Sequence, residues 1–421
     1  MKKILFIIPY IPYPLDSGGD QAFFNMVEYI RKHMSVSILL SYRSQRDKDN
    51  IAALQKTWSN VEFFIFNEKE THYPSTYLRI LHKIKASATR KIRREIRVIR
   101  GKESTLYDSY KQPLSQSYLE YVAQVSRKGF DFIQVEFFEL IALGYILPKD
   151  VETIFVHHEI RYIRNSNEMA LFPHRTEYEE MLFLLGKEFE RGALRQFKHI
   201  IALTDTDRDI LKQFTGSDNV YSSPAVIPMN REGNIHFHPA TTHRLTFLGS
   251  GVHYPNNDAI RWFVTEIAPI LHKKHFQYSL DIIGSWGEKE SKIFQGIKEI
   301  NKIGYVDELH PFINNSVAIV PIRIGSGMRI KILDSIISQV PIITTTKGVE
   351  GIDLTHGKEC LIANSPEEFA DAIIRLCQNT GLQQQLVQQA NLKMDELYQP
   401  EKMLEKRMSI YTLIQNQNIQ A

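Results

Sequence analysis

The stretch Val320-Pro-Ile-Arg-Ile-Gly-Ser-Gly-Met-Arg-Ile-Lys-Ile-Leu-Asp-Ser-Ile336 decides how the rest of this 421-residue chain is interpreted. An apolar strand ends at Val320, a Gly-X-Gly turn follows at Gly325 and Gly327, and a helix pattern begins near Met328. Where a loop becomes a helix, free backbone N–H groups and the positive end of the helix dipole converge. The pattern therefore predicts an anion site at the start of this helix.

Charged side chains add to this site. Arg323, Arg329 and Lys331 bring positive charge to the loop, and Asp334 follows inside the helix. A carboxylate there can accept hydrogen bonds from a hydroxylated ligand. Recognition of phosphate and of a polyol by one strand–loop–helix segment is typical of a nucleotide-sugar site.

Short apolar runs alternate with helical segments over the whole chain, which predicts βα units and parallel sheets. The expected strands fall into two sets: Ile4–Ile8, Val36–Leu40, Val61–Phe66, Phe132–Val135, Thr153–Val156 and His199–Leu203; then Leu245–Leu248, Tyr278–Ile283, Ile300–Ile303, Val317–Val320, Ile342–Thr345 and Cys360–Ile362. The proline-rich segment 222–243 between the sets is expected to be a linker. Two doubly wound domains are predicted, with ligand sites at the carboxyl ends of the strands.

Composition excludes several classes of protein. Hydrophobic residues make up 43% of the chain and charged residues 24%, as in ordinary globular proteins. The formal net charge of +3 is too small to imply a nucleic-acid partner. Cys360 and Cys377 form no metal-ligand cluster, so a buried pair of reduced thiols in a reducing compartment is expected.

The first segment, Met1–Ile8, is too short for the apolar part of a signal peptide and is interpreted as a buried strand. No apolar stretch approaches the roughly 18 residues that span a bilayer. A cytoplasmic protein is therefore expected, at most peripheral on the inner face of the membrane.

One segment departs from the βα pattern. Residues 79–102 hold ten Lys or Arg and one acidic residue, Glu95, and their apolar residues repeat at helical spacing. Two interpretations remain open for this basic amphipathic helix. It packs its apolar stripe on its own domain, or it lies on an anionic membrane surface.

Four segments in order resemble family 4 glycosyltransferases, enzymes of the GT-B fold. The 320–336 stretch is similar to the donor-binding core of that family, and Phe247–Ala259 to the first strand–loop–helix of its C-terminal domain. Gly304–Glu308 resembles the loop that receives the base, and Pro12–Asp20 the glycine pair after the first strand. The resemblance covers most of the chain.

The resemblance implies an α/β fold of two Rossmann-like domains facing across a cleft. Residues 1–225 would form an N-terminal acceptor-binding domain and residues 240–400 a nucleotide-sugar-binding domain, and the helix of residues 401–421 would pack back on the first domain. The implied reaction is sugar transfer, with retention, from a nucleoside-diphosphate sugar to a hydroxyl of a glycan or lipid-linked saccharide. The sugar nucleotide is a co-substrate, and neither another cofactor nor a metal is expected.

For the donor, the resemblance places Asp334 on the ribose and Val306 beside the base. The first glutamate of the family pattern falls on Ser326, so amides of Gly327 and Met328 are expected near the sugar.

The loop after the first strand of the second domain also departs from the family. Ser250 and Gly251 begin this loop, which holds no Arg or Lys. Charge for the diphosphate is therefore expected from Arg329 and Lys331, with Arg323 as a weaker candidate.

In the N-terminal half, Gly18 and Gly19 would bring backbone amides to the ligand, or form a tight turn only. His158 is expected to face the donor sugar and stabilise charge near the anomeric centre, with His157 as the alternative.

Asp205-Thr-Asp-Arg-Asp209 superficially matches the Asp-x-Asp metal motif of another glycosyltransferase fold, but its position predicts a capped helix start after Thr204. Two other functions stay open. One is a nucleotide-sugar epimerase of the same fold, and the other is a non-catalytic saccharide- or membrane-binding scaffold.

Overall fold

The computed structural model describes residues 1–15, 18–68, 106, 114–226 and 236–420. The chain divides into two compact units. One comprises Met1–Tyr13, Arg31–His157 and Glu168–Ile200, and the other comprises Pro14–Ile30, His158–Asn167 and Ile201–Ala421. The predicted domain boundaries at residues 225 and 240 stay a prediction. The basic segment 79–102 lies outside the described residues.

The first sheet has seven strands in the order β3-β2-β1-β4-β5-β6-β7. Its β1–β2, β1–β4, β2–β3 and β4–β5 pairs are parallel, with Ile4 opposite Val36 on one side and Phe132 on the other. Its strands are β1 (Lys3–Ile7), β2 (Ser35–Tyr42), β3 (Glu62–Asn67), β4 (Phe132–Glu136), β5 (Glu152–His157), β6 (His199–Ala202) and β7 (Val220–Ser222).

The connecting segments of this half are helical. They are α1 (Gly18–Ile30), α2 (Gln45–Thr57), α4 (Gln116–Ser126), the 3₁₀ helix η3 (Phe138–Tyr145), α5 (Arg161–Ala170), α6 (Glu177–Leu194) and α7 (Asp205–Thr215). Strand β4 is buried along its whole length, as is typical of a strand covered on both faces.

The second sheet has six strands in the order β10-β9-β8-β11-β12-β13, and all five neighbouring pairs are parallel. The strands are β8 (Arg244–Leu248), β9 (Ser279–Ile283), β10 (Ile300–Gly304), β11 (Val317–Val320), β12 (Ile342–Thr344) and β13 (Leu361–Ile362). The helices are α8 (Tyr254–Trp262), the π-turn η4 (Phe263–Ile267), α9 (Ala268–Lys273), α10 (Glu288–Ser291), α11 (His310–Ile313), α12 (Ile330–Ile337), α13 (Thr346–Val349), α14 (Pro366–Cys377), α15 (Thr380–Leu397) and α16 (Pro400–Gln420).

All twelve strands expected from the sequence are present, with ends that differ by at most two residues. Strand β7 was not predicted, because it has three residues and lies next to Pro224 at the sheet edge. The helical C-terminal segment is confirmed as α16. Cys360 and Cys377 are buried free thiols, as expected, and burial raises the pKa of each to about 12.

Helix starts follow local capping chemistry. The Thr204 hydroxyl accepts a hydrogen bond from the Asp207 amide at 3.0 Å and caps α7. Asp205 and Asp207 lie in the first turn, where negative charge complements the helix dipole. The prediction that 205–209 is a capped helix start is confirmed. In the described part of the chain, no group of three or more His, Cys, Asp or Glu side chains is placed to hold a metal ion.

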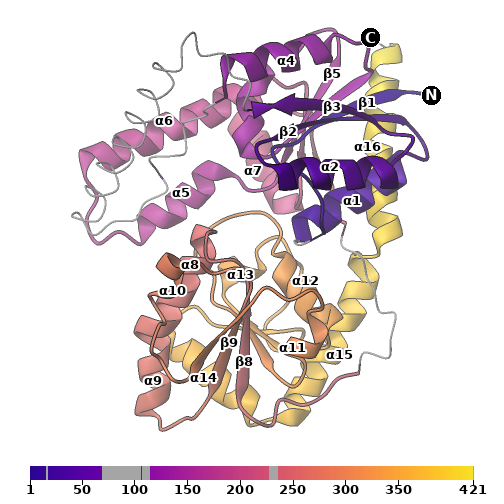
Figure 1. The fold of residues 1–421 in the computed structure, drawn as a ribbon. Helices are drawn as coiled ribbons and strands as arrows, with labels where there is room; N and C mark the ends of the chain where they lie inside the picture. The colour runs from indigo at the N-terminus through magenta and orange to yellow at the C-terminus, as the bar shows by residue number, and fades with distance from the viewer. Residues whose placement is uncertain (16–17, 69–105, 107–113, 227–235, 421) are drawn as a thin grey trace. The chain divides into compact units, whose positions relative to one another are not determined.

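Helix α16 packs along α1, and Figure 1 shows the yellow helix beside the indigo one. Arg407 of α16 is buried between them. Its guanidinium donates to the Ser223 hydroxyl at 2.8 Å, to the Ser223 carbonyl at 3.3 Å and toward Met26 Sδ at 3.3 Å. None of the described helices is long and apolar enough to cross a membrane.

Arg407→Ala should lower the free energy of unfolding by about 1–3 kcal/mol, because Ser223 would be left buried without its donor. Urea unfolding followed by circular dichroism measures this. Ser409→Ala, on the exposed face of the same helix, is the control and should change the value by less than about 0.5 kcal/mol. Equal effects of both changes would show that the buried bonds contribute nothing.

Candidate functional site

The second sheet reverses its strand order between β8 and β11, which are hydrogen-bonded neighbours. Chain connections leave these two strands in opposite directions, so a crevice is expected outside their carboxyl ends. The loop that begins at Gly249 follows β8, and the loop of residues 321–329 follows β11. The predicted donor loops therefore meet at the topological switch point of this sheet.

A hydrogen bond joins the helix that follows β11 to the helix that follows β8. The Lys331 ammonium, in the first turn of α12, donates to Asn256 Oδ1 of α8 at 2.5 Å. Gly249 makes this approach possible. Its φ is +147°, and a Cβ on it would meet the Asn256 amide and come 2.9 Å from Lys331 Nζ. Only glycine fits here without displacing the lysine.

Lys331 forms no ion pair with a carboxylate in the described residues. Its ammonium lies 4.6 Å from the centre of the Phe247 ring. Burial lowers its pKa to about 7, and the nearby charge of Arg329 adds to the effect, while Asp334 opposes it. A buried ammonium without a carboxylate is costly unless an anion joins it. Lys331 is therefore well suited to hold a phosphate.

Arg329 lies beside this lysine. Its Nη1 donates to the carbonyls of Ser326 and Gly327, whereas its Nη2 is buried without a hydrogen bond. Burial lowers the pKa of its guanidinium, and the carboxylates of Glu159, Glu350 and Asp207 oppose that shift.

Asp334 lies three residues after Lys331 on α12 and is half-buried. Burial raises the pKa of its carboxyl to about 7, against the attraction of Lys331. A carboxyl group poised near neutrality can either accept or donate a hydrogen bond to a hydroxyl. Its predicted contact with a ribose stays a prediction.

The polar groups of the Gly325-Ser326-Gly327 loop make more hydrogen bonds within the protein than the sequence indicated. The Ser326 hydroxyl accepts from the Ile160 amide at 2.6 Å, and the Gly325 amide donates to Asn167 Oδ1 at 3.2 Å. The Gly327 amide donates to Asp207 Oδ2 at 3.0 Å. The expectation that the Gly327 amide reaches a ligand stays a prediction, and in this structure a protein carboxylate accepts from that amide.

Arg323 is also engaged. It forms a two-pronged ion pair with Asp258, at 3.1 and 2.8 Å, and its guanidinium lies 5.1 Å from the centre of the Trp262 ring. Such a pair is rigid and already neutralised. It explains why Arg323 is a weaker phosphate candidate than Arg329 or Lys331.

Other predicted donor residues lie at neighbouring strand ends. The Ser250 hydroxyl donates to the Ser285 carbonyl at 3.0 Å, and Gly251 packs where a Cβ would strike the Trp286 ring. Val306 is half-buried two residues after β10. Met328 faces a separate cavity, described below.

The two predicted histidines differ sharply. His157 is 2% exposed, and its Nε2 bonds to Glu190 Oε1 at 2.7 Å. This burial and the bond to Glu190 favour His158 over His157 as the residue that faces a sugar, and the choice between them stays a prediction. His158 is half-buried, and its carbonyl lies where a Cβ on Gly327 would be.

Gly18 and Gly19 form the start of α1.

Sequence reasoning missed several residues. Asn256 lies in the Phe247–Ala259 segment, but no role was assigned to it from the sequence. His253, in the same segment, approaches Glu159 at 3.9 Å. Glu159 also pairs with Arg164 at 2.9 Å; burial raises the pKa of its carboxyl, but Arg164, His253 and Arg161 hold it at about 2. No local sequence pattern predicts such partners, because they come from segments far apart in the chain.

A strained residue marks the switch point of the first sheet, between β1 and β4. Phe137, directly after β4, has φ +71°, which is rare for a bulky side chain. Its ring meets that of Tyr10 edge to face at 5.1 Å. Strain of this kind is frequent at binding sites, and here it coincides with the position where a ligand is expected.

Comparison with known proteins agrees with this geometry. Residues 242–379 match the family model described as glycosyl transferases group 1. The matched residues include all six strands of the second sheet. An uncharacterized 44.6 kDa protein in the cps region of Klebsiella pneumoniae is 28% identical over 143 residues, which is 32% of this chain and 37% of that protein.

Solved structures resemble the chain over nearly its whole length. A TarM variant from S. aureus, in complex with fondaparinux, α-GlcNAc-glycerol and UDP, matches with TM-score 0.67 at 12% identity, covering 98% of this chain and 100% of that one. Sucrose-phosphate synthase from Thermosynechococcus elongatus matches with TM-score 0.67 at 12% identity, over 98% and 99% of the two chains. HepE from Anabaena, in complex with UDP and glucose, matches with TM-score 0.62 at 10% identity, over 98% and 100%. At these identities the likeness shows the fold alone, and the predicted α/β GT-B fold class is confirmed.

Arg329→Ala and Lys331→Ala should each weaken binding of a nucleoside diphosphate by more than about tenfold, because each removes a charged hydrogen bond to phosphate. Calorimetry with UDP measures the affinity. Lys273→Ala, at the exposed end of α9, is the control and should bind as the unchanged protein does. Unchanged affinity in both α12 variants would mean that the phosphate site is elsewhere.

Binding should also take up a proton at Lys331. With a pKa of about 7, this lysine is mostly neutral in the free protein at pH 8, and a bound diphosphate would raise its pKa. Affinity should therefore be greatest below pH 7 and fall as pH rises above it. Calorimetry at pH 8 in two buffers of different ionisation enthalpy should show uptake of about one proton. In Lys331→Arg the uptake should vanish; buffer-independent heat in the unchanged protein would contradict the assignment.

Proposed function

We propose that this protein is a glycosyltransferase that moves a sugar from a nucleoside-diphosphate sugar to an acceptor hydroxyl, with retention of anomeric configuration. The observation that carries the proposal is the half-buried Lys331 at the switch point, whose ammonium bonds to Asn256 and forms no ion pair with a described carboxylate. Arg329 beside it has a buried nitrogen that makes no hydrogen bond. Both features are those of a site built for a doubly charged anion.

The similar proteins support the choice of donor. TarM and HepE have been solved with UDP bound, and HepE with glucose as well. In this chain, Lys331, Arg329 and the N-terminal turn of α12 would hold the diphosphate. Asp334 would hold the ribose, and Val306 would lie beside the base.

The departing diphosphate gains negative charge as the sugar bond breaks, so positive groups that are already in place lower the barrier most. Lys331 and Arg329 are fixed by hydrogen bonds before any ligand arrives. His158 would face the sugar and stabilise charge at the anomeric carbon. The acceptor would be a saccharide or a lipid-linked saccharide, as the resemblance implies and as the match to a protein of a cps region suggests.

The direct experiment follows UDP release from UDP-sugars, with and without an extract of lipid-linked and free saccharide acceptors. Acceptor-dependent release, with a product whose anomeric configuration by NMR matches that of the donor, is the expected result. Conversion of the donor to another UDP-sugar without transfer would instead indicate an epimerase. Saccharide binding without turnover would indicate a scaffold.

His158→Ala should lower turnover by about a hundredfold while UDP affinity stays nearly unchanged, because its partner is the sugar. Steady-state rates and calorimetry separate the two quantities. His174→Ala, an exposed histidine outside the site, is the control. His157→Ala should instead lower thermal stability, since it removes the buried hydrogen bond between His157 and Glu190. Normal turnover in His158→Ala would remove this residue from the mechanism.

A further inference from the structure

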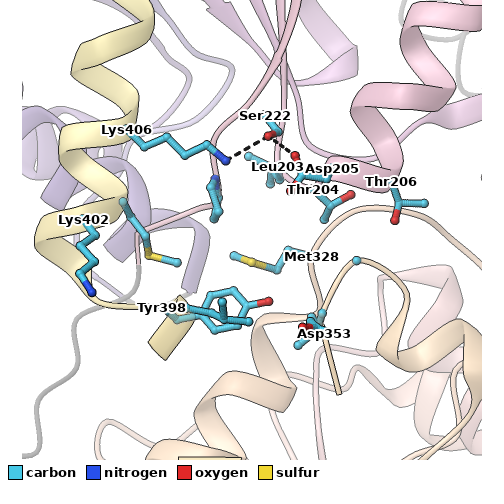
Figure 2. A pocket seen from close by; sticks show the side chains of 15 residues that line it. Leu203, Thr204, Asp205, Thr206, Ser222, Met328, Asp353, Tyr398, Lys402 and Lys406 are labelled. Carbon is cyan, nitrogen blue, oxygen red and sulfur yellow. Dashed lines mark hydrogen bonds between the residues drawn. The ribbon is translucent and has the colours of Figure 1, made fainter. Parts of the chain in front are cut away.

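A cavity of about 620 Å³ lies beside the start of α12, on the side away from Lys331. It is bounded by α16, by the end of α15, by the first turn of α7 and by the loop that holds Gly351–Asp353. Figure 2 shows Met328 projecting into it between Ser222 and Tyr398. None of Arg329, Lys331 and Asp334 lines this cavity. The volume lies in the range of small-molecule sites.

Charged side chains line the cavity. Asp353 pairs with Lys393 at 2.6 Å, and Asp205 pairs with Arg208 at 2.5 Å, which also pairs with Asp209 at 2.8 Å. Lys402 and Lys406, one turn apart on α16, form no ion pair with a described carboxylate. The α16 wall of the cavity therefore presents two ammonium groups without a direct carboxylate partner.

A hydrogen bond holds the Lys406 side chain in position. Its ammonium donates to the Ser222 hydroxyl at 3.1 Å, and that hydroxyl donates to Asp205 at 2.5 Å. Figure 2 shows this chain of contacts along the upper side of the cavity. The arrangement keeps the lysine extended over the cavity, where two of its three donors remain available.

The remaining lining suits a sugar ring. Tyr398 and the two methionines Met328 and Met403 give apolar contact surface, while the Thr206 and Ser222 hydroxyls offer hydrogen bonds. Burial raises the pKa of the Tyr398 phenol, so it stays neutral and can itself take part in hydrogen bonding. The apolar side chains can pack against a sugar ring, the hydroxyls can bond to its hydroxyl groups, and the lysines can bind one anionic group on it.

We infer that this cavity binds a hexose that carries a phosphate or a carboxylate, with its anionic group between Lys402 and Lys406 and its ring against Tyr398 and Met328. This goes beyond the proposed donor site and does not depend on it. The sugar could belong to a free metabolite or to the end of a longer saccharide, and the chemistry of recognition is the same.

The test is calorimetry of the full chain with glucose 6-phosphate, glucuronate, glucose and inorganic phosphate, each without UDP and again in the presence of saturating UDP. Glucose 6-phosphate or glucuronate should bind at least about tenfold more tightly than glucose or inorganic phosphate, because both halves of the site are used. Lys402→Gln/Lys406→Gln should weaken this binding by about tenfold or more. The matched control, Lys56→Gln/Lys273→Gln, removes two exposed lysines elsewhere and should have no effect.

A second variant tests the site from another wall. Thr206→Trp, at the exposed start of α7, should block the cavity and abolish binding even if the lysine variant is poorly folded. Lys331→Ala should leave the affinity for the sugar acid unchanged, whether or not the chain uses UDP-sugars. Three results would overturn the inference: no binding of either anionic hexose, equal binding of inorganic phosphate, or loss of binding on adding UDP or in Lys331→Ala.

Discussion

The bond from Lys331 to Asn256 is the constraint on which the candidate site depends. It ties the first turn of α12 to α8 across the ends of β8 and β11. A positive charge kept there at the expense of its hydration needs a strong reason, because the protein supplies only an amide oxygen and an aromatic face. The proposed anionic ligand would supply that reason. Gly249, Asn256 and the sheet order would then be the geometry that admits it.

A second constraint acts on the loop before α12. Its amide and hydroxyl groups bond to Asp207 of α7, to Asn167 of α5 and to the Ile160 amide just before α5, so two separate segments hold the loop in place. A loop fixed in this way presents Arg329 and Lys331 without reorganising when a ligand binds. Preorganised charge is worth more to a reaction than charge that must first be moved into position.

Much of the fold could be predicted from the sequence. Parallel strands that are buried on both faces read as continuous apolar runs, so each expected strand was visible. Strand β7 was not, since three residues beside a proline carry too little pattern. Within the candidate site, Arg329, Lys331 and Asp334 could be proposed from the sequence because they share one segment, where spacing fixes their relation. Asn256 and Glu159 were given no role of their own, and the burial of His157 against Glu190 was not foreseen, because such contacts join residues far apart in the chain.

Ser326 shows how a motif can change its use. In the family pattern this position holds a carboxylate, whereas here its short hydroxyl accepts from the Ile160 amide and anchors the approach to α5. At this position, a hydroxyl that bonds within the protein stands in place of the carboxylate of the family pattern. A search that demanded an acidic residue at that point would pass over chains like this one, although the basic pair three and five residues later is intact.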